Sequence, residues 1–187
     1  MITLDFFKTL LDVDLDDTDS DDFLQFILDS AKRFVTQETG VLLEKTNVVD
    51  TVLGNDVVFM YLKNRPLNSI IKVTEYYISS DEGVDITDSI KIDDVQFGII
   101  YRDNSYFYSQ YKYVIEYNAG YSNSEDTIPK DLEFAIYQIG LKLFGISNNI
   151  KEGVTKVQTA DGNSFTIDYN LLPDAILQIL NAYRLHF

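Results

Sequence analysis

Residues 113–144 read YVIEYNAGYSNSEDTIPKDLEFAIYQIGLKLF, and this stretch decides the fold class. Apolar residues alternate over Tyr113–Tyr117, which predicts a half-buried strand. The Asn-Ala-Gly sequence at 118–120 ends this strand, because asparagine and glycine tolerate the backbone of a sharp turn. Pro129 suits the first position of a helix, where the N–H that proline lacks is not needed. The stretch therefore predicts a strand, a polar loop and then a helix.

Helices are predicted at both ends of the chain. The helix after Pro129 has an apolar stripe made of Leu132, Ala135, Ile136, Ile139, Leu143 and Phe144, and its periodicity ends over residues 145–149. A short helix is expected over Leu4–Leu11. A long helix is expected over Ser20–Glu38, with Gly40 as the residue that terminates it. It should bury Phe23, Phe26, Ile27, Ala31, Phe34 and Val35. A last helix begins at Pro173, and its stripe is Ala175, Ile176, Ile179, Leu180 and Tyr183.

The middle of the chain reads as antiparallel strands. Gly54-Asn55-Asp56 predicts a hairpin turn, Asp81-Glu82-Gly83 predicts another turn, and Gly98 suggests a bulge. The strands expected around them are Asn47–Leu53, Val57–Leu62, Ser69–Ile78, Val84–Ile92 and Val95–Tyr101. Tyrosines over 101–117 are expected in the sheet core or a subunit interface, with a ligand-stacking platform as the alternative.

A further hairpin is predicted between the last two helices. Val154–Ala160 and Asn163–Tyr169 alternate and flank Asp161-Gly162, a strong hairpin signal. Because an isolated two-stranded hairpin is marginally stable, this arm should pack on the body or pair with a neighbouring sheet. The arm residues expected to make such a contact are Val157, Asp161, Gly162, Phe165, Ile167 and Tyr169.

The charge and the lack of cysteine in the sequence exclude or disfavour several classes of function. The 187 residues carry 30 acidic and 15 basic side chains, a formal net charge of −15, with no cysteine. DNA gripping is disfavoured because the basic residues are scattered, whereas an acidic wall suits a channel past which DNA slides. Disulfides and thiolate metal sites are excluded, because the sequence has no cysteine. The stretch MITLDFFK lacks the basic start and long apolar run typical of a signal peptide, so none is expected, and no apolar run reaches the length of a membrane span. A cytoplasmic place of synthesis is expected.

Asp12–Asp22 is the densest acidic segment. Its alternating aspartates imitate the start of an EF-hand loop, but Asp17 stands where glycine is required and Phe23 where the bidentate glutamate belongs. The preferred interpretation is a solvated loop in which Thr18 and Asp21 approximate a capping box for the next helix. A calcium-binding module and a DNA-mimicking inhibitor remain the alternative functions.

No catalytic constellation is recognisable. The only histidine, His186, is the penultimate residue, and the sequence has no nucleophile-elbow, P-loop or dinucleotide-binding motif. We therefore expect no enzymatic activity, no cofactor and no metal.

Three parts of the sequence resemble the head–tail connector (head-completion, or adaptor) proteins of tailed bacteriophages. The first is the strand ending in Ala119-Gly120-Tyr121, followed by Ile128-Pro129-Lys130-Asp131-Leu132 and Ala135. The second runs from Leu62 to Ile70 and contains Arg65-Pro66. The third runs from Leu172 to Arg184 and contains Pro173, Tyr183 and Arg184.

The resemblance implies an α+β connector subunit. One connector domain is expected over 1–187, with helical parts at 1–45 and 128–187, a β-rich insert at 46–120 and a hairpin arm at 153–169. The helices from the two ends would form a small bundle, and the insert an antiparallel β subdomain. The implied partners are further copies in a ring that matches the portal, twelvefold in symmetry, the portal itself, and a tail-completion or stopper protein. DNA would pass through without sequence-specific binding, and the implied location is the virion's head–tail junction.

Overall fold

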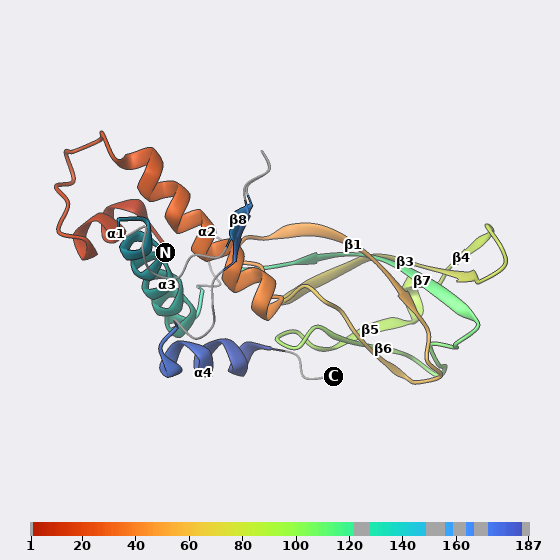
Figure 1. Ribbon diagram of the computed structural model, residues 1–187. Coiled ribbons are helices and arrows are strands. Elements are labelled where there is room, and N and C mark those ends of the chain that lie inside the picture. Colours follow the sequence, from red (N-terminus) through yellow and green to blue (C-terminus); the bar gives the residue numbers. More distant parts are fainter. Residues whose placement is uncertain (1, 122–127, 149–155, 159–163, 167–171, 185–187) are drawn as a thin grey trace. The chain divides into compact units, whose positions relative to one another are not determined.

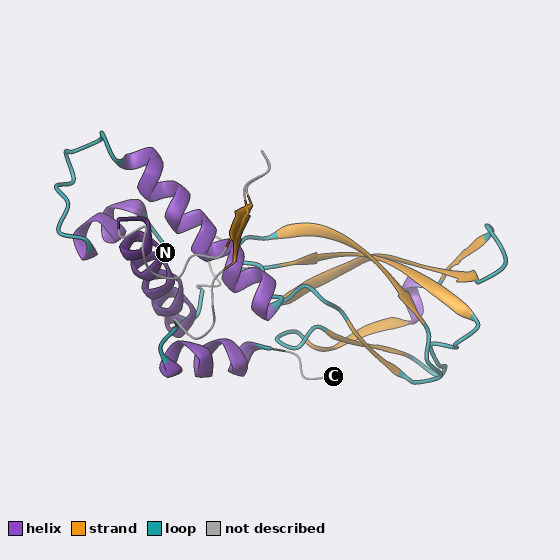
Figure 2. Ribbon diagram, in the orientation of Figure 1, coloured by secondary structure: helices purple, strands orange, loops and turns teal. Residues whose placement is uncertain are grey.

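The computed structural model describes residues 2–121, 128–148, 156–158, 164–166 and 172–184. The expected α+β class is confirmed, with helices and antiparallel sheets in separate parts of the chain (Figures 1 and 2). The chain divides into two compact units. Unit 1 combines residues 1–39 with 128–186 and holds the helices, whereas unit 2 spans residues 40–127 and is β-rich.

Unit 1 contains four described helices, α1 (Leu4–Leu10), α2 (Asp21–Thr39), α3 (Lys130–Asn148) and α4 (Asp174–Tyr183). The Thr3 hydroxyl caps α1 by accepting a hydrogen bond from the Phe6 N–H. The carbonyls of Pro129 and Pro173 accept the first hydrogen bonds of α3 and α4, so each proline lies one residue before its helix. The helical periodicity is expected to end over residues 145–149, and α3 ends at Asn148, within this range.

The core of unit 1 lies where α1, α2, α3 and α4 pack together. Its fully or nearly fully buried apolar residues include Phe7, Leu24, Leu28, Ala31, Val35, Leu132, Ala135, Ile136, Ile139, Ile176 and Leu180. The predicted stripe of α2 is partly wrong, because Phe23 and Phe26 are exposed while Leu24 and Leu28 are buried. Gly140 allows α1 to approach α3 closely, since a Cβ there would lie 3.1 Å from the Phe7 ring.

A four-stranded antiparallel sheet forms the larger layer of unit 2. Its strands are β1 (Thr46–Leu53), β7 (Tyr111–Ala119), β3 (Leu67–Tyr77) and β4 (Gly83–Asp85), side by side in that order. Strand β7 lies between β1 and β3 and alternates as predicted, because Tyr113, Ile115 and Tyr117 are fully buried. These three side chains therefore define the face of the sheet that covers the core.

A three-stranded antiparallel sheet forms the second layer, with β2 (Phe59–Tyr61), β6 (Ile99–Arg102) and β5 (Ile90–Asp94) in that order. Gly98 lies in the turn between β5 and β6 with a φ of +63°, rather than in a bulge. The predicted hairpin at 54–56 is wrong, because β1 and β2 belong to different sheets. The core between the two sheets is formed by Met60, Leu62, Leu67, Val73, Ile90, Ile100, Phe107, Tyr113, Ile115, Tyr117 and Ala119.

The predicted arm between the last two helices contains a hairpin. Strands β8 (Lys156–Gln158) and β9 (Ser164–Thr166) pair antiparallel, with Val157 opposite Phe165. The Asp161-Gly162 turn and the predicted contact residues Ile167 and Tyr169 lie outside the described residues.

Candidate assembly surfaces

Backbone hydrogen bonds join three separate segments of unit 2. Two of these segments lie close to the points where the chain enters unit 2 from unit 1 and returns to it. The Leu42 N–H donates to the Arg65 carbonyl at 2.8 Å, and the Tyr121 N–H donates to the Leu42 carbonyl at 3.2 Å. The Gly120 N–H donates to the Pro66 carbonyl at 2.8 Å. We call these segments, residues 40–44, 63–68 and 118–121, the strand junction. It contains all five of the predicted motif residues that lie in unit 2.

Two glycines make the strand junction possible. Gly120 has a φ of +109°, and a Cβ there would lie 2.2 Å from the Glu44 carbonyl oxygen. Gly40 has a φ of +71°, and its Cβ would lie 2.5 Å from the Lys63 carbonyl oxygen. In both cases the obstacle is backbone, which cannot rotate away as a side chain can. The glycine of the Ala-Gly-Tyr motif is therefore required by close approach as well as by its φ.

Buried side chains complete the strand junction. Arg65 is 2% exposed, Ala119 is fully buried, and Tyr121 is buried as well. Burial lowers the pKa of the Arg65 guanidinium from its ordinary value, although the nearby Tyr121 opposes this effect. The Asn68 side-chain amide donates to the Gly120 carbonyl at 2.7 Å, which holds the turn after β7 against the start of β3.

The motif residues of unit 1 hold its helices together. Leu132 and Ala135 are fully buried on α3. The Tyr183 hydroxyl at the end of α4 lies 2.9 Å and 3.0 Å from the two carboxylate oxygens of Asp131, at the start of α3. The Arg184 guanidinium donates to the carboxylate of Glu38 and to its carbonyl, close to the end of α2. A cation there also complements the negative end of the helix dipole.

The interior of unit 2 contains an ion pair between its two sheets. Arg102 on β6 lies 2.5 Å from the Glu75 carboxylate on β3, and both side chains are 13% exposed. Tyr113 on β7 is beside them, and burial followed by the Glu75 carboxylate raises its pKa above the ordinary value. The pair ties the sheets together at a defined register.

A second buried tyrosine has a complete set of hydrogen bonds. The Tyr117 hydroxyl donates to the Asp50 carboxylate at 2.5 Å and accepts from the backbone and side-chain N–H groups of Asn64, each at 3.3 Å. Burial and then the bond to Asp50 raise the pKa of Tyr117 above its ordinary value. The Asp50 carboxylate on β1 therefore points toward the sheet core and bonds to a buried hydroxyl.

Lys8 occupies the centre of the acidic segment 12–22. Its side chain is 2% exposed, and its ammonium nitrogen lies 2.6 Å from the Asp17 carbonyl, 3.2 Å from the Leu15 carbonyl and 2.5 Å from the Asp21 carboxylate. These three oxygens surround a cation that the chain itself supplies. The expected capping box is not the observed start of α2: the Ser20 carbonyl accepts the first helical bond, and Asp21 pairs with Lys8.

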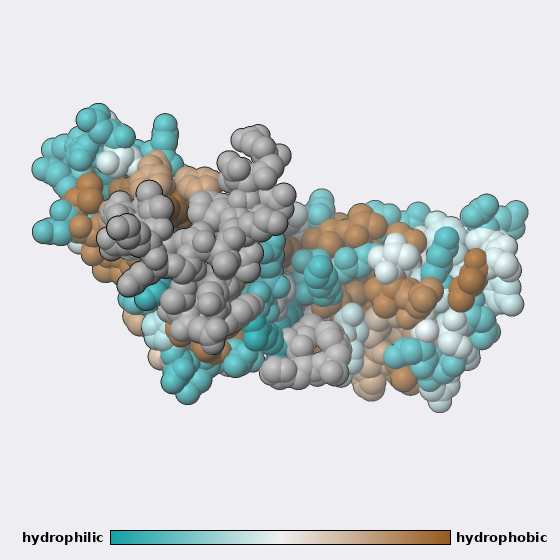
Figure 3. Space-filling model, viewed as in Figure 1, coloured by the Kyte–Doolittle hydropathy of each residue, from teal (hydrophilic) through white to brown (hydrophobic). Residues whose placement is uncertain are grey.

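Ordered apolar side chains are exposed on unit 2. Among them are Val49, Leu53, Phe59, Tyr61, Ile71, Tyr77, Ile78, Val84, Tyr106 and Tyr108. Tyr77 and Tyr111 face each other across β3 and β7 with their ring centroids 5.5 Å apart. Figure 3 shows hydrophobic and hydrophilic side chains interspersed over the visible face of this unit.

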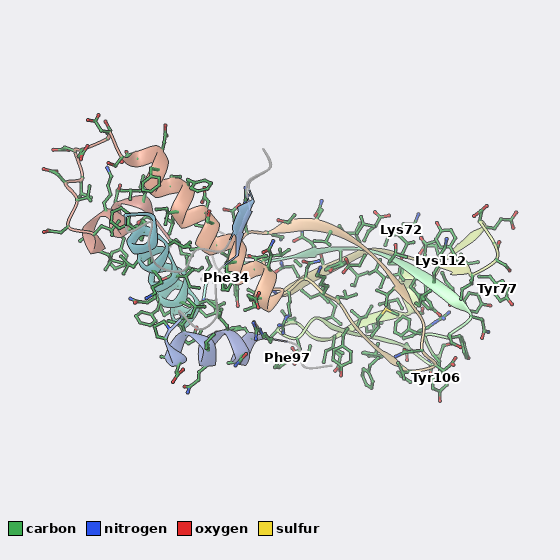
Figure 4. The ribbon with its side chains drawn as sticks, viewed as in Figure 1. Phe34, Lys72, Tyr77, Phe97, Tyr106 and Lys112 are labelled. Atoms are coloured by element: carbon green, nitrogen blue, oxygen red, sulfur yellow. The ribbon has the colours of Figure 1, made fainter. Side chains whose placement is uncertain are left out.

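The tyrosines of residues 101–117 divide between two environments. Tyr113 and Tyr117 lie in the sheet core, whereas Tyr106 and Tyr108 are exposed at 48% and 37%. Figure 4 labels Tyr77 and Tyr106, and also Lys72 and Lys112, which lie on β3 and β7 of the four-stranded sheet. Tyr106 and Tyr108 lie in the loop between β6 and β7, and exposed tyrosines are typical of protein interfaces.

The described residues contain neither a metal-binding cluster nor a helix able to span a membrane. Within the ranges that the structure describes, no three histidine, cysteine or acidic side chains are grouped so that they could hold a metal ion. None of the described helices has the length and hydropathy that a bilayer crossing requires.

Apolar and aromatic side chains exposed on the strands of unit 2 are typical of protein interfaces. A family model described as "Head completion protein" matches residues 1–186, and the chain belongs to this family. No curated protein matches the chain.

Solved structures support the fold assignment. A chain from the virion of a native gene transfer agent (GTA) particle has a TM-score of 0.67 at 12% identity, and the alignment covers 97% of this chain and 88% of that one. A chain from the neck of an empty GTA particle, computed with C6 symmetry, has a TM-score of 0.64 with the same identity and coverage. A third, from the neck of the native particle computed with C12 symmetry, has a TM-score of 0.59 at 12% identity, covering 86% and 81%.

Proposed function

We propose that this chain is a structural subunit of a head–tail connector ring in a tailed-phage virion, made in the cytoplasm of the bacterial host. The observation that carries the proposal is the match of the head completion family over residues 1–186. Similar folds in particles whose necks were computed with C6 and C12 symmetry support a ring, which would be twelvefold like the portal.

The ring docks on the portal, extends the DNA channel and offers an attachment surface to a tail-completion or stopper protein. A ring needs a heterologous interface, because the same two different surfaces must meet at every subunit boundary. The net charge of −15 suits a channel wall from which phosphate is repelled, and DNA would pass without sequence-specific binding. Residues 1–187 act as one connector domain in this proposal.

The predicted arm residues Val157, Asp161, Gly162, Phe165, Ile167 and Tyr169 are proposed to contact the portal or a neighbouring subunit. Strand addition would give such a contact main-chain hydrogen bonds, and an open strand edge favours it. The motif residues, from Arg65 and Pro66 to Tyr183 and Arg184, are proposed to be structural, since they lie in the strand junction and at helix ends.

The proposal is tested with DNA-filled heads from a phage lacking this gene. Purified protein should be a monomer or weak oligomer, should be retained by portal-bearing heads, and should restore tail attachment. A variant in which a Gly-Ser linker replaces 154–169 should fold with unchanged melting of the helices yet leave heads tailless or leaking DNA. Failure of the wild-type protein to bind portal-bearing heads would refute the connector function; normal virions from the linker variant would remove the arm from it.

A further inference from the structure

The described residues of unit 2 form two sheets with four edges, namely the strands β1, β4, β2 and β5. Strands β4 and β2 are three residues long, and β5 carries Lys91, Asp93 and Asp94. Short length and charge are the features by which native proteins discourage pairing at an edge. Three of the four edges are therefore protected against the addition of another strand.

Strand β1 lacks both forms of protection. It has eight residues, pairs with β7 along its whole length and, among the described residues, has no strand on its other side. Its sequence contains no lysine and no proline, and its one charged residue, Asp50, bonds inward to the Tyr117 hydroxyl. An edge of this kind is a template for strand addition.

The exposed face of β1 carries two large apolar side chains beside the polar Asn47 and Thr51. Val49 and Leu53 are each 64% exposed, although both lie in the middle or at the end of a regular strand. A strand added beside β1 would cover them, since directly opposite residues on paired strands bring their Cβ atoms within about 5 Å. Strand β1 thus combines exposed apolar side chains with an open edge, and both features favour the addition of another strand.

The chain itself carries a segment suited to this edge. The hairpin β8–β9 forms a sheet of only two strands, and within the described residues neither strand has another strand partner. The alternating sequence around β8, residues 154–160, is close in length to β1. Because two-stranded hairpins are marginal alone, a third strand would stabilise the arm.

We infer that the β8–β9 arm of one subunit adds as a strand to the β1 edge of the next subunit in the ring, an inference that rests on the proposed connector function. The donor lies in unit 1 and the acceptor in unit 2, so the contact is heterologous and repeats from copy to copy. When the ring closes, every β1 edge is covered. Until a subunit joins the ring on the portal, its β1 edge has no strand beside it among the described residues.

The absence of cysteine from the sequence allows a direct test by cross-linking. Subunits carrying only Val49→Cys are mixed with subunits carrying only Val157→Cys, assembled on portal-bearing heads and oxidised. We expect a disulfide dimer, because only contact between two copies can join these positions. Val84→Cys, on the protected β4 edge and 63% exposed, replaces Val49→Cys in the control mixture and should give no dimer with Val157→Cys.

A pair of lysine substitutions tests whether the contact drives assembly. Val49→Lys and Val84→Lys change side chains of nearly equal exposure, and each new lysine faces a glutamate in register, Glu116 and Glu75 respectively. Both should melt like the wild type, because opposite charges across strands are tolerated. Val49→Lys should reduce ring occupancy on heads at least tenfold, and Val84→Lys should leave it unchanged.

The outcomes separate this inference from the function on which it rests. If wild-type protein forms no ring on heads, the connector function and the inference both fail. If the wild type forms rings and Val49→Lys assembles equally well, or if Val49→Cys cross-links to the portal or another neck protein instead of a second copy, the connector function stands and the β1–arm contact is wrong.

Discussion

Replacement of Lys8 by methionine tests the interpretation of the acidic segment. The ammonium group donates to the carbonyls of Leu15 and Asp17 and pairs with Asp21 while only 2% of the side chain is exposed. Methionine keeps most of the apolar stem but removes the charge and all three polar contacts. Seven aspartates over residues 12–22 then lose the one cation that lies among them.

The expected cost follows from these contacts. Removal of one partner of a buried ion pair costs about 3–5 kcal/mol. Asp21 is 32% exposed and the loop carbonyls can be hydrated after the change, so we expect the lower figure of about 2–3 kcal/mol. For a chain of this size that loss lowers the melting temperature by roughly 6 °C.

Urea unfolding followed by circular dichroism measures the loss. The matched control is Lys32→Met, which removes an ammonium group 3.2 Å from Asp29 on the surface of α2 and should cost about 0.5 kcal/mol or less. Equal stability of the two variants would refute the role given to Lys8. Calcium is the second readout, since occupancy at 100 times the dissociation constant would stabilise the fold by about 2.7 kcal/mol. Millimolar calcium should leave wild-type melting unchanged, and a rise of several degrees would support the calcium-module alternative.

Two other predictions concern unit 2. Gly120→Ala should cost about 3 kcal/mol or prevent folding of this unit, because its Cβ would lie 2.2 Å from the Glu44 carbonyl oxygen at a φ of +109°. The control is Gly145→Ala on α3, where a Cβ would meet nothing within 4 Å, and it should be neutral or stabilise the protein by up to about 1 kcal/mol. Equal urea midpoints for the two variants would contradict the close approach at Gly120. Alkaline pH should destabilise the wild type: the pKa of Tyr117 is raised in the folded state, so its contribution is complete below the unfolded pKa of about 10 and is lost as pH rises further. Tyr117→Phe should lower stability at pH 8 and flatten its decline above pH 10, and an unchanged slope would exclude this residue as the cause.

Local patterns in the sequence were sufficient where burial follows the period of one element. The alternation at Tyr113–Tyr117 and the stripe beginning at Leu132 both correspond to fully buried side chains. On α2 the pattern was ambiguous, because Phe23 and Leu24, and Phe26 and Ile27, are adjacent apolar residues. Which of each pair is buried depends on the neighbouring helices, and these bury Leu24 and Ile27.

The wrong hairpin at 54–56 has a non-local cause. The Gly54 N–H donates to the Tyr111 carbonyl, and the N–H groups of Asn55 and Asp56 both donate to the Phe107 carbonyl. These turn residues are therefore bonded to a loop more than fifty positions away, and the chain passes from one sheet to the other. A turn motif indicates a change of direction, but the sheet to which the next strand belongs depends on contacts that the local sequence does not encode.

Burial of Lys8 and the pairing of Arg102 with Glu75 were also beyond local prediction. Isolated lysines in an acidic chain are expected at the surface, and only the folded loop brings two carbonyls and a carboxylate to the Lys8 ammonium. The motif residues were found through their resemblance to a family. Their structural roles are close backbone approach at Gly120 and helix-end contacts at Arg184, and both depend on segments that are distant in the sequence.

The strand junction has a consequence for how such proteins can change. Residues 42 and 121 are joined by a backbone hydrogen bond, so the β-rich segment leaves and rejoins the chain at nearly the same point. A segment attached in this way can be lengthened, shortened or exchanged without altering the distance that the flanking polypeptide must bridge. β-rich segments of different length could thus be inserted at the same point between the helices of unit 1. A connector of different width or depth could then evolve while the helices of unit 1 stay unchanged.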